Sequence, residues 1–188
     1  MSVKLDVGVG AHLYPVPAVM VSCGDVSGQR NIITIAWTGV LASDPPAVGV
    51  GVREMRHSYD MIRDTGEFVV NLPRVDQVEA LDYCGVASGR DVDKFSECGL
   101  TPAKAEMLKY APLIKECPVN LECRVVQRLE LGSHDYFVGQ VVRASVIDEW
   151  VDDRGKLAVP PGELITYARG TYHRVGDALG QHGFAGNR

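Results

Sequence analysis

The sequence predicts a mainly β fold, a β-barrel with short helical additions. Three observations lead to this prediction: many short apolar runs of strand type, hairpin connections between several of them, and only one or two short helical patterns. The chain has 188 residues and 46% of them are hydrophobic, enough for one domain with a sizeable core. Because the sequence contains no internal repeat and no linker, we expect residues 1–188 to form one domain.

Charge and hydropathy exclude several classes of protein. Lys and Arg number 19 and Asp and Glu number 24, which gives a net charge of −5. An acidic chain argues against general binding to nucleic acid or to a membrane surface. No apolar run approaches the roughly 20 residues that span a bilayer, and the N-terminus lacks the apolar stretch of a signal peptide. We expect a cytoplasmic protein that binds neither nucleic acid nor membrane.

The cysteines predict no metal site. There are five, they include no Cys-x-x-Cys pair, and no second pair lies at the spacing of zinc ligands. Ordinary buried or half-buried thiols in a reducing compartment are the favoured interpretation. The five are Cys23, Cys84, Cys98, Cys117 and Cys123.

The chain begins with an extended segment followed by a hairpin. Within residues 1–17, Pro15 and Pro17 fix φ and discourage a helix. Residues 18–23 and 31–37 have the pattern of strands, and the glycine-containing segment between them has turn chemistry.

The second strand of this hairpin has two different faces. Ile33, Ile35 and Trp37 share one face, whereas the other carries the smaller Thr34 and Ala36. Small side chains leave room for a flat ligand or for a helix that packs close. On the pattern alone, the helix is favoured.

A loop over residues 38–46 and a strand over residues 47–52 come next. Gly49 and Gly51 remove two side chains from one face of that strand. Such gaps indicate close approach of a backbone or a ligand, or a bulge or bend of a barrel. The pattern does not separate these two interpretations.

A polar segment after that strand has the chemistry of a phosphate site. Ser58 is a candidate N-cap and Gly66 a candidate helix end. A helix N-terminus offers free N–H groups and a partial positive charge. Arg53, Arg56 and His57 add positive charge directly before it. A solvated turn with a capping serine is the alternative, but so many cations within five residues favour a site for a phosphate monoester.

Residues 67–72 read as a strand in which Asn71 has a structural role. A helix is predicted over residues 75–84, followed by a polar, glycine-punctuated loop over 85–100. Its lysine is able to reach an anionic ring or a phosphate, but on the pattern alone a solvated charge cluster is the default interpretation. Residues 101–118 are expected to be irregular.

Residues 119–131 and 134–147 predict a long hairpin. His134 follows its turn, where a lone histidine is more often a surface residue than a catalytic one. After a polar loop, residues 164–167 and 171–175 form two short strands or turns. The tail, residues 176–188, is predicted to be an arm or disordered.

Five segments in order resemble the flavin reductase-like family, in particular its flavoredoxin branch. The resemblance covers roughly residues 12–175 and implies the FMN-binding split β-barrel and a homodimer. The segments are PVPAVMVSC, NIITIAWTGVLASDPPAVGVGV, REMRHSYDMIRDTGEFVVNLP, SGRDVDKF and LGSHDYFVGQVV.

The resemblance also implies roles for individual residues. The second strand lines the isoalloxazine and the ribityl chain, with Thr34 near the reactive edge of the flavin. Thr34 and His134 are the implied catalytic residues. Many relatives have Gly-Asp-His where this chain has Gly-Ser-His, although Asp135 follows directly. The implied FMN-binding residues are Asn31, Thr34, Ala36 and Trp37 on the strand, Arg53, Arg56, His57 and Ser58 at the phosphate, Ser88, Arg90 and Lys94 in the SGRDxDKF loop with Lys94 approaching the flavin, and His134 and Tyr167.

The function implied by this resemblance is that of an FMN-dependent oxidoreductase. It would pass electrons from NAD(P)H or a protein donor through FMN to flavin, ferric iron or a partner protein. The sequence lacks the G-x-G-x-x-G of a nicotinamide-binding module, so NAD(P)H would bind only transiently over the flavin. Three alternatives remain: a non-catalytic electron carrier, a split-barrel binding module without flavin, and a pyridoxamine-phosphate oxidase-like enzyme, whose motif order matches less well.

Overall fold

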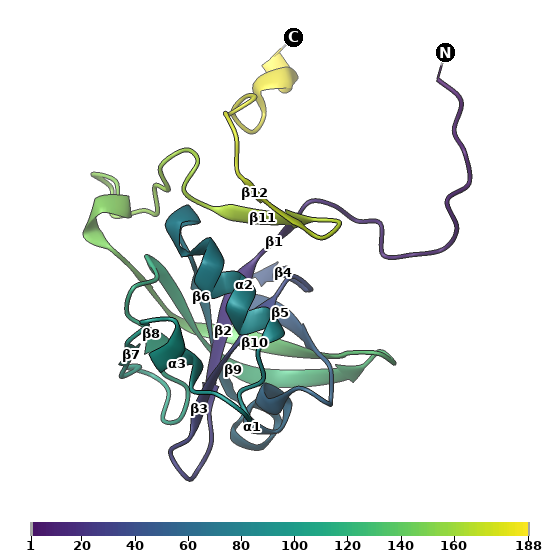
Figure 1. Cartoon of the computed structure of the whole chain (residues 1–188). Helices are drawn as coiled ribbons and strands as arrows, with labels where there is room; N and C mark the ends of the chain where they lie inside the picture. The colour runs from purple at the N-terminus through teal and green to yellow at the C-terminus, as the bar shows by residue number, and fades with distance from the viewer. Residues whose placement is uncertain (1, 188) are drawn as a thin grey trace.

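A computed structural model describes residues 2–187 of the chain. Its centre is an antiparallel seven-stranded sheet with the strand order β3-β2-β6-β9-β10-β5-β4 (Figure 1). The strands are β2 (Val19–Gly24), β3 (Arg30–Ile35), β4 (Thr38–Ser43), β5 (Pro46–Val52), β6 (Glu67–Leu72), β9 (Val119–Glu130) and β10 (Asp135–Val146).

The sheet curls into a barrel because its two edge strands are consecutive in the chain. Only two residues separate β3 from β4, and the Gly51 N–H donates a hydrogen bond to the Trp37 carbonyl across this junction (2.7 Å). Apolar side chains fill the interior, among them Val21, Val50 and Phe68. Burial of these side chains is the main favourable contribution to folding.

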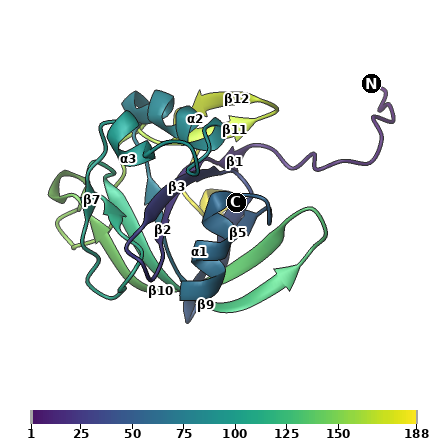
Figure 2. The ribbon, with the colours of Figure 1, turned by 60° about the horizontal axis from the view of Figure 1, so that its bottom comes forward.

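Short helices close and cover the barrel. Helix α1 (His57–Thr65) covers one end and contributes Met61 and Ile62 to the interior (Figure 2). Helices α2 (Val78–Val86) and α3 (Lys94–Glu97) form a second apolar cluster with β2 and β3. The remaining elements are β1 (Val16–Pro17), β11 (Ile165–Ala168) and β12 (Thr171–Arg174), which form a three-stranded sheet, the pair β7 (Pro102–Ala103) and β8 (Leu113–Ile114), and the 3₁₀ turns η1 (Val75–Gln77), η2 (Asp148–Trp150) and η3 (Phe184–Asn187).

The main elements confirm the mainly β prediction. The hairpins β2–β3 and β9–β10 lie where the sequence places them. Helix α1 ends at Gly66, which adopts φ 67°, a conformation that favours glycine. Asn71 has the predicted structural role, since its amide donates to the Met20 carbonyl and accepts from the Ile114 N–H (both 3.0 Å).

Two predicted loops are wrong in part. Residues 38–46 contain β4, which pairs with β5 at the edge of the sheet. Because β4 is mostly exposed, it lacks the alternation of a half-buried strand. Residues 85–100 contain α3, where the Asp93 carboxylate caps the helix by accepting from the Phe95 N–H (3.0 Å).

The two glycines of β5 make room for a side chain. A Cβ on Gly49 would lie 2.0 Å from the ring of Tyr136, which belongs to the neighbouring strand β10. A Cβ on Gly51 would meet Trp37 at 3.1 Å. The gap that the sequence indicated is thus occupied by aromatic side chains of the same chain.

Figure 1 shows the N-terminal segment and the C-terminal residues extending away from the barrel. Across residues 2–187, no helix is both long and apolar enough to span a bilayer. Within the same residues, no cluster of three or more potential metal ligands is found.

Candidate functional site

A cavity of about 470 Å³ opens beside the end of β3. The junction after β3, the end of β5, the β9–β10 turn, helix α2 and the β11–β12 hairpin all contribute to its wall. Its side chains are mainly aromatic or small, with several charged groups among them. They include Thr34, Ala36, Trp37, Arg53, Arg56, Asp82, His134, Tyr167 and Tyr172.

A smaller pocket of about 90 Å³ adjoins this cavity. Arg56 and Gly85 line both spaces, so the two are neighbours on one surface. The pocket lies between the start of α1 and the loop before α3. We call it the cationic pocket, and its polar side chains are Asn31, Arg56, His57, Ser88, Arg90 and Lys94.

Lys94 is the most buried cation of the cationic pocket. Its side chain is only 4% exposed, and Nζ donates to the carbonyls of Ile32 and Cys84, both at 2.8 Å. Burial lowers the pKa of Lys94, and Arg56 lowers it further. An ammonium group has three N–H donors, and these two carbonyls account for two of them.

The other cations of the pocket also lack a carboxylate. Among residues 2–187, none of Arg56, Arg90 and Lys94 forms an ion pair with Asp or Glu. The Arg90 guanidinium donates to the Met55 carbonyl (2.9 Å). Burial lowers the pKa of His57, and the nearby Arg90 and Lys94 lower it further. So much positive charge without a counter-ion makes the pocket suitable for an anion.

Ser58 does not cap helix α1, which corrects the prediction. The N-cap is Arg56, which makes no capping side-chain hydrogen bond. Ser58 is fully buried, and its Oγ accepts a hydrogen bond from the Asn31 amide (2.9 Å). The Tyr59 N–H donates to the Arg56 carbonyl (2.9 Å). Without a side-chain cap, the His57 and Ser58 N–H groups at the start of α1 are left beside the cationic pocket.

Gly89 allows the loop before α3 to approach β3. A Cβ at this position would lie 2.2 Å from Asn31 Oδ1. A larger residue would therefore push the loop, and with it Ser88 and Arg90, away from the pocket.

Thr34 is in the cavity wall, but its hydroxyl is engaged. The Oγ donates to the Leu81 carbonyl of α2, and a Cβ on Gly85 would come within 3.2 Å of the Thr34 Cβ. The small face of β3 therefore accommodates a closely packed helix, the alternative that the sequence pattern favoured.

His134 is held in one neutral tautomer at the cavity edge. Its ring stacks on Trp37, with centroids 6.2 Å apart and planes at 23°. Arg53 Nε lies 3.3 Å from His134 Nε2, and a guanidinium N–H can only donate, so Nε2 is the acceptor. Nδ1 then carries the proton and donates to Ser133 Oγ (2.9 Å). Burial lowers the pKa of His134, as do Arg53 and Arg56.

Asp82 and Tyr172, which also line the cavity, were missed by the sequence analysis. The Tyr172 hydroxyl donates to Asp82 (3.2 Å), and its ring lies 5.7 Å from that of Tyr167. Burial and the nearby carboxylate raise the pKa of Tyr172 to about 12. The repeated tyrosines of the last two strands were the one available signal, because Asp82 comes from a distant helix.

The structure brings the sequence-derived candidates together on one surface. All of them except Ser58 line the cavity or the cationic pocket. Lys94 lies with the phosphate-type cations and does not line the larger cavity. Asp135, which follows His134, turns away from the cavity toward Tyr59.

Comparisons with known proteins agree with this architecture. The family model for the flavin reductase like domain matches residues 11–176. The flavoredoxin of Desulfovibrio vulgaris (Miyazaki F) is 29% identical with a TM-score of 0.89, covering 98% of this chain and 100% of that one. The flavoredoxin of Methanosarcina acetivorans is 32% identical with a TM-score of 0.86, covering 100% and 98%.

A more distant structure shares the fold. An FMN-binding protein from Thermus thermophilus is 23% identical with a TM-score of 0.79, covering 96% of this chain and 99% of that one. The family-model match spans most of the chain and agrees with the resemblance carried by the five sequence segments. This chain therefore belongs to the flavin reductase-like family.

Proposed function

We propose that the chain binds FMN, with the phosphate in the cationic pocket and the ring system in the adjoining cavity, and acts as a flavin-dependent oxidoreductase. The observation that carries the proposal is the buried Lys94 together with Arg56, His57 and Arg90, without a carboxylate among the described residues to balance the arginine and lysine charges. A phosphate monoester carries nearly two negative charges at neutral pH and three acceptor oxygens, which match these donors.

The remaining site residues fit a flat aromatic ligand. Trp37 and Tyr167 provide apolar surface, and neutral His134 provides a polar group at the edge. When bound, FMN supplies the redox chemistry, while the protein supplies position and electrostatics. The names of the structural relatives, flavoredoxin and FMN-binding protein, support the same cofactor.

The first test is the visible absorption spectrum of the purified protein, followed by identification of the chromophore released on denaturation. We expect the bands of oxidised flavin, and FMN in the supernatant. A colourless protein that takes up no added FMN would contradict the proposal and favour a binding module without flavin.

The proposed donor is NAD(P)H or a redox protein, and the proposed acceptor is free flavin, ferric iron or a partner protein. A non-catalytic electron carrier is the second candidate, and the flavoredoxin relatives favour keeping it. NADH and NADPH oxidation by the FMN-loaded protein separates the two. Rapid turnover would rule out a pure carrier, and no turnover with either nucleotide would rule out the NAD(P)H-dependent reductase.

We also propose a homodimer, with a second copy covering an apolar groove of about 190 Å³ beside β4. Val40 at this groove is 81% exposed, and an exposed apolar edge strand is a surface that proteins normally cover. Light scattering after gel filtration should give twice the chain mass, and Val40→Asp should give a monomer. A wild-type monomer at micromolar concentration would contradict this proposal. The groove is lined by Pro17, Val40, Leu72, Leu121 and Leu164, among others.

A further inference from the structure

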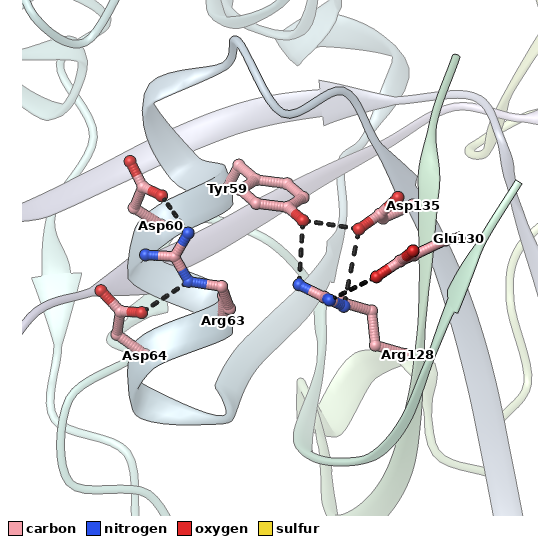
Figure 3. Close-up of polar contacts among 7 residues, drawn as sticks. All are labelled: Tyr59, Asp60, Arg63, Asp64, Arg128, Glu130 and Asp135. Carbon is pink, nitrogen blue, oxygen red and sulfur yellow. Dashed lines mark hydrogen bonds and ion pairs between the residues drawn. The ribbon is translucent and has the colours of Figure 1, made fainter. Parts of the chain in front are cut away.

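A buried carboxylate lies directly behind the cavity edge. Asp135 is only 3% exposed, and the Tyr59 hydroxyl donates to its Oδ2 (2.5 Å). Arg128 Nε lies 3.5 Å from the same oxygen, and Arg128 Nη1 donates to the Tyr59 hydroxyl (3.1 Å). Figure 3 shows the three groups in a closed triangle, with Glu130 bound to the outer side of the arginine.

This inner network joins three segments that carry site residues. Asp135 follows His134 and pairs in register with Val52, the residue before Arg53. Tyr59 lies in the first turn of α1, two residues after His57. The Asp135 carboxylate therefore connects the β9–β10 hairpin to the start of α1, and the Asp135 backbone pairs with the end of β5.

A second network on the same helix provides a contrast. Arg63 pairs with Asp60 and Asp64, at 2.8 and 2.7 Å, and its guanidinium lies 5.8 Å from the ring centroid of Tyr59 (Figure 3). These side chains are 43–59% exposed, and all three belong to α1. This outer network has the same chemistry but holds no other segment in place, and exposed ion pairs of this kind have little effect on a fold.

Burial separates the two networks energetically. A buried charge has a large desolvation cost, and removal of one of its partners leaves it uncompensated. Hydrogen bonds from a phenol and a guanidinium are directional, so they fix where the Asp135 backbone lies. Since Asp135 is bonded to His134 in the chain, the same contacts also limit where the imidazole is placed.

We propose that Asp135 is a positioning residue that acts through Tyr59 and Arg128 to hold His134 against Trp37 and Arg53 in the cavity wall. The relevance of this placement to catalysis rests on the proposed function, whereas the placement itself does not. If the contact is lost, the turn loosens and His134 becomes more exposed. Burial, Arg53 and Arg56, which together lower the pKa of His134, then all act on the imidazole less.

The test measures the pKa of His134 by NMR titration of the full chain without FMN. We expect this pKa to rise toward the ordinary value of histidine in Tyr59→Phe and in Asp135→Asn. Tyr59→Phe keeps the ring that packs on Phe137 (5.5 Å), so it decides the question even where Asp135→Asn does not fold. The matched control is Asp64→Asn, the same carboxylate-to-amide change in the outer network.

A general loss of stability would not move the pKa of His134 while leaving that of the exposed His173 unchanged. An unchanged His134 pKa in folded Tyr59→Phe overturns the inference, as does an equal rise in Asp64→Asn. In the FMN-loaded protein, Tyr59→Phe and Asp135→Asn should each raise the FMN dissociation constant about threefold to tenfold. This is the change expected when one hydrogen bond to the ligand is lost. Failure of this second arm alone would count against His134 as an FMN contact, and hence against the proposed function, but not against the positioning.

Discussion

The cationic pocket and the larger cavity are neighbours on one surface, yet they are built in different ways. The pocket draws its cations from two short stretches, residues 56–57 and 90–94. Its arginines and its lysine have no carboxylate partner among the described residues. The cavity takes its side chains from five separate parts of the fold, and most of them are aromatic, small or neutral. In the proposed function the pocket recognises charge and the cavity recognises a ring.

The largest effect that this comparison predicts is for Lys94→Met. Loss of a buried charged donor should weaken FMN binding by about 1.5–3 kcal/mol, roughly 10- to 150-fold, while riboflavin, which lacks the phosphate, should bind nearly as before. Fluorescence titration with both ligands measures this. Equal weakening for the two ligands would mean that Lys94 contacts the ring and not the phosphate.

Gly89→Ala should disturb the pocket through shape. The added Cβ would lie 2.2 Å from Asn31 Oδ1, so the loop must shift, at a cost of about 1–3 kcal/mol in the free energy of unfolding. A thermal melt should show a lower Tm, and Gly176→Ala, where a Cβ meets nothing within 4 Å, serves as the control. An unchanged Tm in Gly89→Ala would show that the loop is not packed against Asn31.

Trp37→Ala tests the cavity side of the comparison. Removing the ring that stacks on His134 should weaken FMN and riboflavin equally, by about 1 kcal/mol. The same titrations measure it. If Trp37→Ala weakened the binding of FMN but not that of riboflavin, the cavity would not be the part of the site that recognises the ring.

The smallest effect expected is on the pH dependence of stability. The folded chain lowers the pKa of both His57 and His134 below the ordinary 6.5, so near and below that pH the unfolded chain binds more protons. The free energy of unfolding therefore falls as the pH decreases from about 6.5 through the lowered values.

Thermal melts between about pH 7.5 and 5 measure this dependence. The double variant His57→Asn, His134→Asn should show a shallower decline. An equally steep decline would assign the acid sensitivity to other groups.

Sequence reasoning reached the fold well where local patterns are strong. The apolar runs of β2, β3, β5 and β6 alternate or are fully buried, and their hairpin turns have recognisable chemistry. Strand β4 was missed because it lies mostly exposed at an edge of the sheet. Residues 38–43 form a strand because they pair with β5 in the folded chain, and the local sequence pattern does not show this pairing.

In the candidate site, too, features carried by local sequence were predicted, whereas features set by tertiary contacts were not. The cations of the pocket were found because they cluster in the sequence beside a helix start. Ser58 was assigned to the N-cap because residue type cannot show whether a side chain turns inward to Asn31. Asp82 and Tyr172 meet only through the fold, and the neutral tautomer of His134 depends on Arg53, which follows β5 far away in the sequence.

The most direct test of the central claim is a comparison of FMN and riboflavin affinities in the wild-type protein. If the cationic pocket holds the phosphate, FMN should bind at least about tenfold more tightly, since at least one charged hydrogen bond is gained. Equal affinity for the two ligands, or none for FMN, would contradict the account.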